Sequence, residues 1–435
     1  MLATGRSART ETVEIICKTF VRQHVYHYHV TSADMTDREF TPFKERTPLD
    51  DARNRLREHV GAHDRVEHVP FDDADGRVVA STITAEANVP HYPRAAMDGY
   101  AVRAEDTFGA SDRSPVVLRS TDEQVEHRTA RQVHTGSELP EGADAVVMIE
   151  HVEEVGGEVE LFQPVGEGEN VGPIGEDVKQ GQTLYEPGQQ LRPSDLGLLK
   201  SVGLTEVPVF ERPTVSVIPT GEELVQSDPE PGEIIETNGL TVSRLVERWG
   251  GEATYNDIVT DDEQLLTEAI EEALSHDIVV TTGGSSVGKR DLLPEVVSDI
   301  GEVIVHGVGI KPGHPVALGV VEDTPILILP GYPVSCLINA VQFLRPALAW
   351  AVGTTPEPFP TVTARLDEKI YSEPGLRSFA RVQLHERDGE DVATSVRASG
   401  AGVLSSVALS DGWVVVPESR EGLDGGETVT VHRWE

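Results

Sequence analysis

The stretch from Val279 to Asp291, VVTTGGSSVGKRD, places glycines, hydroxyls and two cations directly after an apolar run. Gly283 and Gly284 allow backbone N–H groups to come close to a ligand, and Ser285 and Ser286 add hydroxyl donors. A helix expected nearby would add the positive end of its dipole, which favours an anion. Because an ordinary turn between a strand and a helix has the same composition, the stretch alone is a weak signal.

Three further loops of this kind, PTGEEL, VTDDE and LPGYPVS, strengthen the signal. From about residue 213 to 350, expected strands alternate with expected helices, which predicts a parallel sheet. All four loops leave strands at the carboxyl edge of that sheet, where ligands of open α/β sheets bind. Carboxylates together with substrate phosphates are the ligands that Mg²⁺ prefers. The acids at these loop positions are Glu222, Glu223, Asp261, Asp262 and Asp291.

Two other motifs could contribute charge to such a site. The segment GIKPGHPVALG places Lys311 and His314 in a loop stiffened by Gly and Pro, and lysine is scarce in this chain. Asp98 lies in PRAAMDGYAV, which a surface hairpin turn would also explain, and Asp177 lies in NVGPIGEDVKQG. Ser/His/Asp order, paired cysteines, HExxH and the GxxxxGK[ST] phosphate loop are all absent from the sequence. The expected chemistry is therefore positioning and electrostatic stabilisation around an anion.

The net charge of the chain limits which class of protein it can be. Its 435 residues carry 74 acids and 36 bases, a formal net charge of −38. The acids are spread over all segments, so a halophilic surface explains them better than an acidic tail for a basic partner. This balance argues against nucleic-acid binding. The sequence shows no long apolar run for a membrane, no signal-peptide core, and only two cysteines, so we expect a cytoplasmic location.

The organisation of the chain predicts several domains. We expect a leader of residues 1–40 without regular structure, a discontinuous linking domain of residues 41–84 with 182–210, a mostly β domain of residues 85–181, an α/β domain of residues 211–352 and a C-terminal β domain of residues 355–435. A capped helix is expected from Thr47, and Ser194 or Asp195 is expected to cap another. His24, His27 and His29 in the leader could form a metal cluster, but no further Cys or acid ligand lies at metal-site spacing.

Nine motifs in this order resemble those of the MoeA-type molybdopterin molybdenumtransferases, a family that includes the E domain of gephyrin. They are AAMDGYAV, TGSELPEGADAVV, GED, PTGEEL, TNGLTVSRLVERWGGE, IVTDDE, TTGGSSVG followed by Asp291, IKPGHP and LPGYPVS. The resemblance covers roughly residues 45–435. It implies a multidomain α/β plus β fold: a central molybdopterin-binding-type domain with a parallel-rich sheet, a mostly β domain and a small C-terminal β-barrel-like domain. It also implies a homodimer with the active site at the subunit interface.

The implied reaction inserts molybdate or tungstate into adenylylated molybdopterin, with Mg²⁺ assistance and release of AMP. Carried over motif by motif, the catalytic acids are Asp98, Asp177, Glu223, Asp261 and Asp291. Three of them, Glu223, Asp261 and Asp291, are predicted to hold the metal. The residues predicted to bind the substrate are Thr220, Gly221, Gly283, Gly284, Ser285, Ser286, Gly288, Lys289, Lys311, Pro312, Gly313, His314, Pro330 and Gly331.

Three positions depart from the pattern of this family, which usually has an acid at Lys289, a lysine at His314 and an asparagine at Tyr332. These departures leave the choice between molybdate and tungstate open. They also leave open two alternatives: a molybdopterin-binding paralogue or scaffold without metal insertion, and a molybdopterin adenylyltransferase. An adenylyltransferase would not need the flanking β regions, which here carry family motifs.

Overall fold

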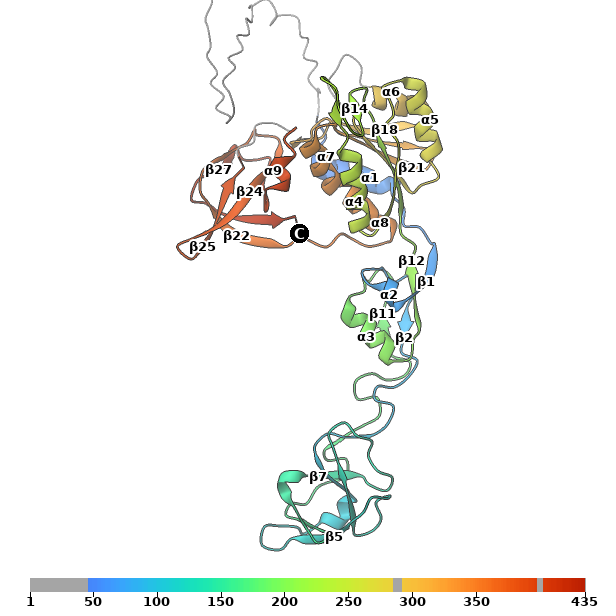
Figure 1. The fold of residues 1–435 in the computed structure, drawn as a ribbon, viewed down its shortest axis with the longest axis vertical. Helices are drawn as coiled ribbons and strands as arrows, with labels where there is room; N and C mark the ends of the chain where they lie inside the picture. Colours follow the sequence, from blue (N-terminus) through green and yellow to red (C-terminus); the bar gives the residue numbers. More distant parts are fainter. Residues whose placement is uncertain (1–45, 285–291, 397–401, 435) are drawn as a thin grey trace, which may run out of the picture. The chain divides into compact units, whose positions relative to one another are not determined.

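The structure is a computed structural model that describes residues 46–284, 292–396 and 402–434. The α/β region is built around a mixed sheet (Figure 1). This sheet has six strands in the order β16 (Glu252–Tyr255), β13 (Thr214–Pro219), β17 (Ile278–Thr282), β21 (Thr324–Leu329), β20 (Ala317–Val321) and β18 (Glu302–His306). The first four strands are parallel, and β20 and β18 add an antiparallel edge. The predicted parallel-rich sheet is confirmed, and the antiparallel edge goes beyond that prediction.

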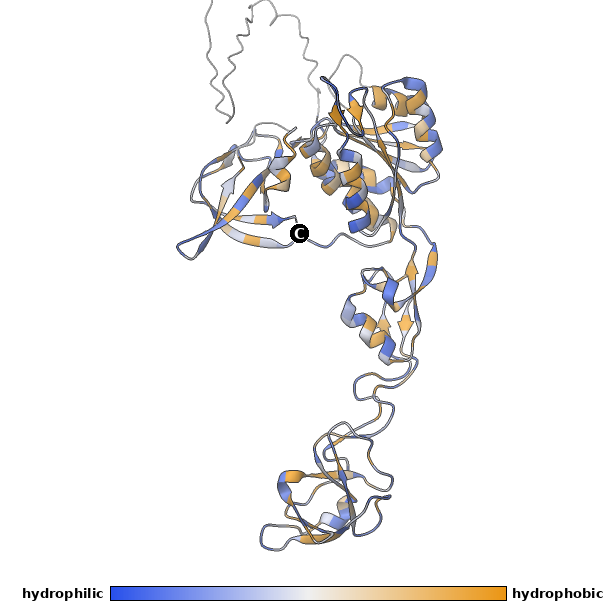
Figure 2. Cartoon of the chain, viewed as in Figure 1, coloured by the Kyte–Doolittle hydropathy of each residue, from blue (hydrophilic) through white to orange (hydrophobic). Residues whose placement is uncertain are grey.

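Helices cover both faces of this sheet because successive strand residues point to opposite sides. In β17, Val280 belongs to one apolar core and its neighbour Val279 to the other. The first core is covered by α1 (Leu49–His59), α4 (Asn238–Arg248), α7 (Pro333–Asn339) and α8 (Arg345–Ala351). The second is covered by α5 (Glu263–Ala273) and α6 (Leu292–Ile300), which carry both hydrophobic and hydrophilic residues (Figure 2).

One helical stretch, Pro333–Ala351, is long and apolar enough to cross a membrane by composition alone. It consists of α7, the π-helical segment η3 (Ala340–Leu344) and α8, and 78% of its most apolar window is buried inside the protein. Its side chains belong to the core beneath the α/β sheet. The stretch is therefore the core helix of this region.

The linking region is built by two distant segments that meet. Strand β1 (Val66–Pro70) pairs antiparallel with β12 (Glu206–Phe210), and β2 (Ile83–Thr84) pairs with β11 (Thr183–Tyr185). Helices α2 (Phe71–Ala74) and α3 (Pro193–Ser201) complete a small apolar core around Val79 and Leu199. The chain leaves this region after β2 and returns to it before β11.

The excursion between these segments is mostly β. A six-stranded sheet has the order β7 (Ala145–Met148), β4 (Gly99–Val102), β6 (Thr129–Val133), β5 (Val116–Ser120), β9 (Glu158–Leu161) and β8 (Val152–Val155). Two short strands, β3 (Arg94–Ala95) and β10 (Val171–Gly172), pair beside it, and the 3₁₀ turns η1 (Ala104–Thr107) and η2 (Ile149–His151) connect its strands.

The C-terminal region is a closed barrel, as the sequence predicts. Its five strands are β24 (Arg377–Arg387), β25 (Glu390–Ser395), β22 (Thr361–Leu366), β28 (Thr428–Arg433) and β26 (Gly412–Val416), and β26 pairs back with β24. Beside the barrel lie β23 (Ile370–Tyr371), β27 (Gly422–Leu423) and α9 (Ser405–Ala408). Strand β19 (Ile310–Lys311) of the α/β region joins the edge of β24 in parallel.

Both predicted helix caps are wrong in detail. Helix α1 begins at Leu49 after Pro48, without a side-chain cap. Helix α3 begins at Pro193 with Arg192 as its N-cap, because the ring of proline suits the first helical position. Asp195 lies in the first turn and accepts from the Arg192 backbone N–H at 2.8 Å.

Candidate functional site

The loops that leave β13, β17 and β21 meet at one edge of the α/β sheet. Gly283 has a φ of +143°, and a β-carbon there would lie 2.1 Å from the Thr220 carbonyl oxygen. A β-carbon on Gly331 would lie 3.6 Å from the Cα of Gly283. The predicted residues Thr220, Gly283, Gly284 and Gly331 therefore come together, and glycine allows their backbones to touch.

The loop after β13 folds a carboxylate back over its own backbone. Gly221 has a φ of +149°, and a β-carbon there would lie 2.9 Å from the Glu223 Oε2 atom. The Gly221 N–H donates to the Val259 carbonyl at 3.1 Å, so this loop is tied to the loop that carries Asp261. Gly221 thus leaves room for the Glu223 carboxylate to pack against its own loop.

Glu223 and Asp261 lie within electrostatic reach of each other. Asp261 is exposed, but local burial of its carboxyl raises the pKa of Asp261, and the negative charges of Glu223 and Glu222 raise it further. A bound cation would relieve this repulsion. Among the residues that the structure describes, no three His, Cys, Asp or Glu side chains are placed to hold a metal together. The third predicted ligand, Asp291, lies outside the described residues.

Four further predicted residues, Ser285, Ser286, Gly288 and Lys289, also lie outside the described residues. The described strand ends at this edge are polar: the hydroxyls of Thr220, Thr281 and Thr282 are buried and have no hydrogen-bond partner within residues 46–284, 292–396 and 402–434. A buried hydroxyl usually has a partner. This edge of the sheet therefore offers donors to a ligand or to the adjoining loop.

The loop with Lys311, Pro312, Gly313 and His314 is fastened to helix α7. Asn339 is fully buried, and its amide donates to the Gly313 carbonyl at 3.0 Å and to the Ser335 carbonyl at 2.8 Å. Gly313 has a φ of +105°, and a β-carbon there would lie 2.3 Å from the Asn339 Nδ2 atom. Since α7 begins just after the Pro330–Gly331 turn, the helix positions this loop relative to the end of β21.

Tyr332 extends the same edge toward the C-terminal region. Its side chain is largely exposed, and a β-carbon on Gly402 would lie 3.4 Å from the Tyr332 ring. Next to it, the Asn238 amide donates to the Gly331 carbonyl at 2.8 Å, which joins the start of α4 to the loop after β21. Tyr332 thus places an exposed aromatic side chain at this edge.

Two buried polar residues that hold the site were missed from the sequence. The Glu236 carboxylate accepts from the Gly239 N–H at 2.7 Å and from the Tyr255 hydroxyl, which fixes the start of α4. Burial and the bond to Glu236 raise the pKa of Tyr255. Asn339 is the second. Signals existed in both cases, because Glu236 precedes a helix in ETNG and Asn339 interrupts the apolar run CLINAVQFL.

Asp98 and Asp177 lie in the mostly β region. The pairing of β3 with β10 brings their two segments together. The Asp98 Oδ1 atom accepts from the Thr135 N–H at 2.7 Å and the Thr135 hydroxyl at 3.0 Å, and these bonds lower the pKa of Asp98. Asp177 is exposed. Across the described part of the chain, no hydrogen bond or ion pair joins these two acids to Glu223 or Asp261.

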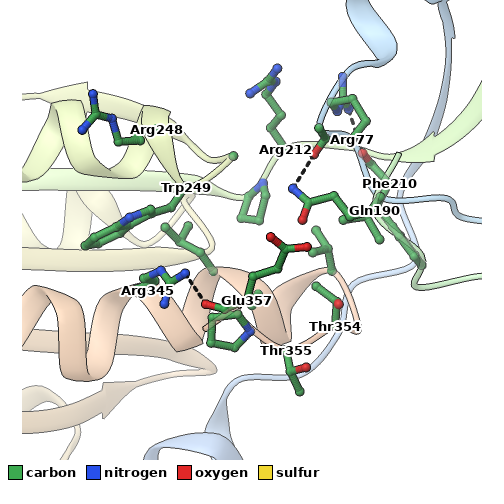
Figure 3. A pocket seen from close by; sticks show the side chains of 18 of the residues that line it. Arg77, Gln190, Phe210, Arg212, Arg248, Trp249, Arg345, Thr354, Thr355 and Glu357 are labelled. Atoms are coloured by element: carbon green, nitrogen blue, oxygen red, sulfur yellow. Dashed lines mark hydrogen bonds between the residues drawn. The ribbon is translucent and has the colours of Figure 1, made fainter. Parts of the chain in front are cut away.

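A separate pocket of about 360 Å³ lies elsewhere in the fold (Figure 3). It is lined from β12, the end of α4, α8 and the following linker, and its labelled side chains include Arg212, Trp249, Arg345 and Glu357. Of the predicted site residues that the structure describes, none lines this pocket. The converging strand-end loops remain the candidate site.

Comparison with known proteins identifies the family. Residues 47–203 match the MoeA N-terminal region (domain I and II), residues 216–350 the probable molybdopterin binding domain, and residues 363–434 the MoeA C-terminal region (domain IV). The chain belongs to the MoeA family. A Methanocaldococcus jannaschii protein named for molybdopterin biosynthesis is 38% identical over 391 residues, which is 87% of this chain and 94% of the relative.

Two further similarities extend over most of the chain. The molybdopterin molybdenumtransferase of Haemophilus influenzae is 32% identical over 397 residues, covering 88% of this chain and 97% of the relative. Two crystal structures of the molybdopterin biosynthesis MoeA protein from Pyrococcus horikoshii match with TM-scores of 0.78 and 0.76, at 36% and 34% identity. Both cover 90% of this chain and 100% of theirs. The MoeA matches on both sides of the α/β region count against a free-standing adenylyltransferase.

Proposed function

We propose that this protein is a molybdopterin molybdenumtransferase that inserts molybdate or tungstate into adenylylated molybdopterin and releases AMP. The observation that carries the proposal is the edge of the α/β sheet where Gly221, Glu223, Asp261 and Gly283 meet. The glycines there let an anion come close to the backbone, and the carboxylates of Glu223 and Asp261 lie within electrostatic reach of each other. The name of the Haemophilus influenzae relative supports the same activity.

Glu223 and Asp261 would hold Mg²⁺, and Asp291 would join them. The residues present fit this ion, because the charge of Glu223 raises the pKa of Asp261, and a divalent cation would offset this repulsion. When bound, Mg²⁺ would neutralise phosphate charge as AMP leaves. The chain's own residues would orient the substrate. The glycines let it come close to the backbone, and Lys311 adds a positive charge from the neighbouring loop.

The proposal includes a homodimer with a shared site. Asp98 and Asp177 lie in a different region from Glu223 and Asp261, so a site that uses all four would be completed by a second copy of the chain. Closed twofold symmetry then gives two equivalent sites for each dimer. The ionised, exposed Asp98 carboxylate is suited to such a role, because its Thr135 bonds hold it in place without burying it.

The direct test is a single-turnover assay with adenylylated molybdopterin and Mg²⁺ in molar KCl, with molybdate and tungstate supplied separately. We expect AMP release that depends on one of the two oxyanions. Glu223→Gln should abolish this release while pterin binding and the circular dichroism spectrum remain. Tight pterin binding without AMP release from either oxyanion would instead indicate a paralogue that binds the cofactor without inserting metal.

The shared site has its own test. Asp98→Asn and Glu223→Gln proteins should each be inactive, and refolding them together should restore about a quarter of the activity, since about half of the dimers are mixed and each has one intact site. Asp98→Asn mixed with Asp177→Asn is the matched control, because both changes affect the same region and no intact site forms. Equal activity in both mixtures would contradict the shared site.

A further inference from the structure

An exposed ion pair joins the α/β region to the C-terminal region at the loop predicted to bind substrate. The Lys311 Nζ atom donates to the Glu373 Oε1 atom at 2.5 Å, and the two side chains are 52% and 62% exposed. The partners are 62 residues apart in sequence. Glu373 belongs to none of the motifs that carry the family resemblance.

The backbones on both sides are fixed independently of this ion pair. Strand β19 pairs with β24 through Ile310 and Lys311, and the Arg377 N–H donates to the Gly309 carbonyl at 2.8 Å. On the other side, the turn that contains Glu373 is closed by a 3.2 Å bond from the Leu376 N–H to the Glu373 carbonyl. Loss of the ion pair would therefore leave Lys311 in place.

Positive charge surrounds Glu373. The hydrogen bond from Lys311 is the largest cause that lowers the pKa of Glu373, and Arg46 and His314 lower it further. Burial lowers the pKa of His314, as do Arg46 and Lys311, and Glu373 raises it. In a chain of net charge −38, two cations, Lys311 and Arg46, within electrostatic reach of one carboxylate are a local reversal of the overall balance.

We propose that Glu373 is the internal counter-ion of Lys311, which an anionic group of the substrate displaces, so that Glu373 sets the affinity of the site for phosphate-bearing ligands. This inference rests on the proposed function and deepens it. An exposed ion pair contributes little to stability, so exchanging it costs little. A phosphate group carries more charge than a carboxylate and gains more from the same lysine. Glu373 thus keeps the lysine oriented between turnovers.

The test uses the full-length protein, with inorganic pyrophosphate as the probe and calorimetric titration without Mg²⁺ at fixed KCl concentration. Glu373→Gln should bind pyrophosphate about two- to fivefold more tightly, the change expected from removing an exposed competitor. The matched control is Asp424→Asn, which removes the same charge from an exposed pair with Lys369 at 2.9 Å in the same region. This control should bind like the unmodified protein.

A second pair of variants shows whether the gain passes through Lys311. Lys311→Met should weaken pyrophosphate binding, and the Lys311→Met/Glu373→Gln protein should bind no more tightly than Lys311→Met. Unchanged, weaker or undetectable binding by Glu373→Gln would overturn the inference, as would an equal gain in Asp424→Asn.

The counter-ion role and the proposed function can fail separately. If Glu373→Gln binds pyrophosphate more tightly only when Lys311 is present, but the unmodified protein releases no AMP, the counter-ion role is supported and the proposed function fails. If AMP release is normal but Glu373→Gln has unchanged pyrophosphate affinity, the proposed function stands and the counter-ion role fails.

Discussion

Replacing Gly283 by alanine should separate the strand-end loops and abolish turnover while the protein stays folded. A β-carbon at this position would lie 2.1 Å from the Thr220 carbonyl oxygen, at a φ of +143°. The backbone strain costs on the order of 1–3 kcal/mol. Overpacking against backbone adds about 1–3 kcal/mol, so the total is about 2–6 kcal/mol. Because folded domains are stable by about 5–15 kcal/mol, most of the variant should remain folded.

A matched control separates this local effect from lost stability. Gly422 has a φ of +147°, and a β-carbon there would lie 2.1 Å from the Ile370 carbonyl oxygen, but it belongs to β27 beside the C-terminal barrel. Gly283→Ala and Gly422→Ala should therefore lose similar stability by scanning calorimetry, and Gly283→Ala alone should lose AMP release in the single-turnover assay. Full turnover by Gly283→Ala, or an equal loss by Gly422→Ala, would refute the role assigned to the strand-end loops.

The coupled carboxylates and two buried polar side chains lead to three further predictions. The negative charge of Glu223 contributes to raising the pKa of Asp261, so Mg²⁺ affinity should fall as the pH drops through that raised pKa. In the Glu223→Gln protein this fall should begin at a lower pH. Titration with Mg²⁺ at several pH values measures both. Asn339→Ala loses two buried hydrogen bonds and should lower the free energy of unfolding by about 2–3 kcal/mol. The Gly313 amide should then exchange faster with solvent. Unchanged exchange would argue against Asn339 as the residue that holds the Gly313 loop. Burial raises the pKa of the Cys336 thiol, so mass mapping should find it unmodified by a thiol reagent in the native protein and modified after unfolding; labelling of the native protein would contradict this burial.

Much of the α/β region could be predicted because its signals are local. Strands such as β13 and β17 are short runs rich in valine and isoleucine, and α4 and α5 have helical spacing, so their order along the chain predicts a parallel sheet. The parallel arrangement then places the four following loops at one edge. The antiparallel edge formed by β20 and β18 has no comparable signal, because strand direction depends on connections rather than on composition.

The residues that hold the site could not be derived in the same way. Asn339 and Gly313 are 26 residues apart, and Lys311 and Glu373 are 62 apart, so neither contact belongs to any local pattern. A buried asparagine in an apolar run signals a structural hydrogen bond but does not name its partner. The sequence therefore predicts that these loops follow the strand ends, and the packing of α7 and β24 decides how the Lys311 loop is held.

Asp98 shows how the structure distinguishes two explanations of one motif. Asp-Gly between apolar runs is typical of a hairpin turn. In the structure, however, Gly99 begins β4, which pairs with β6 and β7, and a β-carbon on Gly99 would lie 1.9 Å from the Val147 carbonyl oxygen. The glycine is required for this close approach of strands rather than for a turn, so the turn explanation fails.

The Asp98 carboxylate is held through one of its two oxygen atoms. Both of its bonds from Thr135 fall on the Oδ1 atom, and they favour the ionised form of an exposed group. Such bonds orient the carboxylate while leaving its Oδ2 atom open to a further partner. A site completed by a second chain requires a carboxylate that is held in place, ionised and exposed. This is why Asp98, rather than the less constrained Asp177, is the residue to pair with Glu223 in the subunit-mixing experiment.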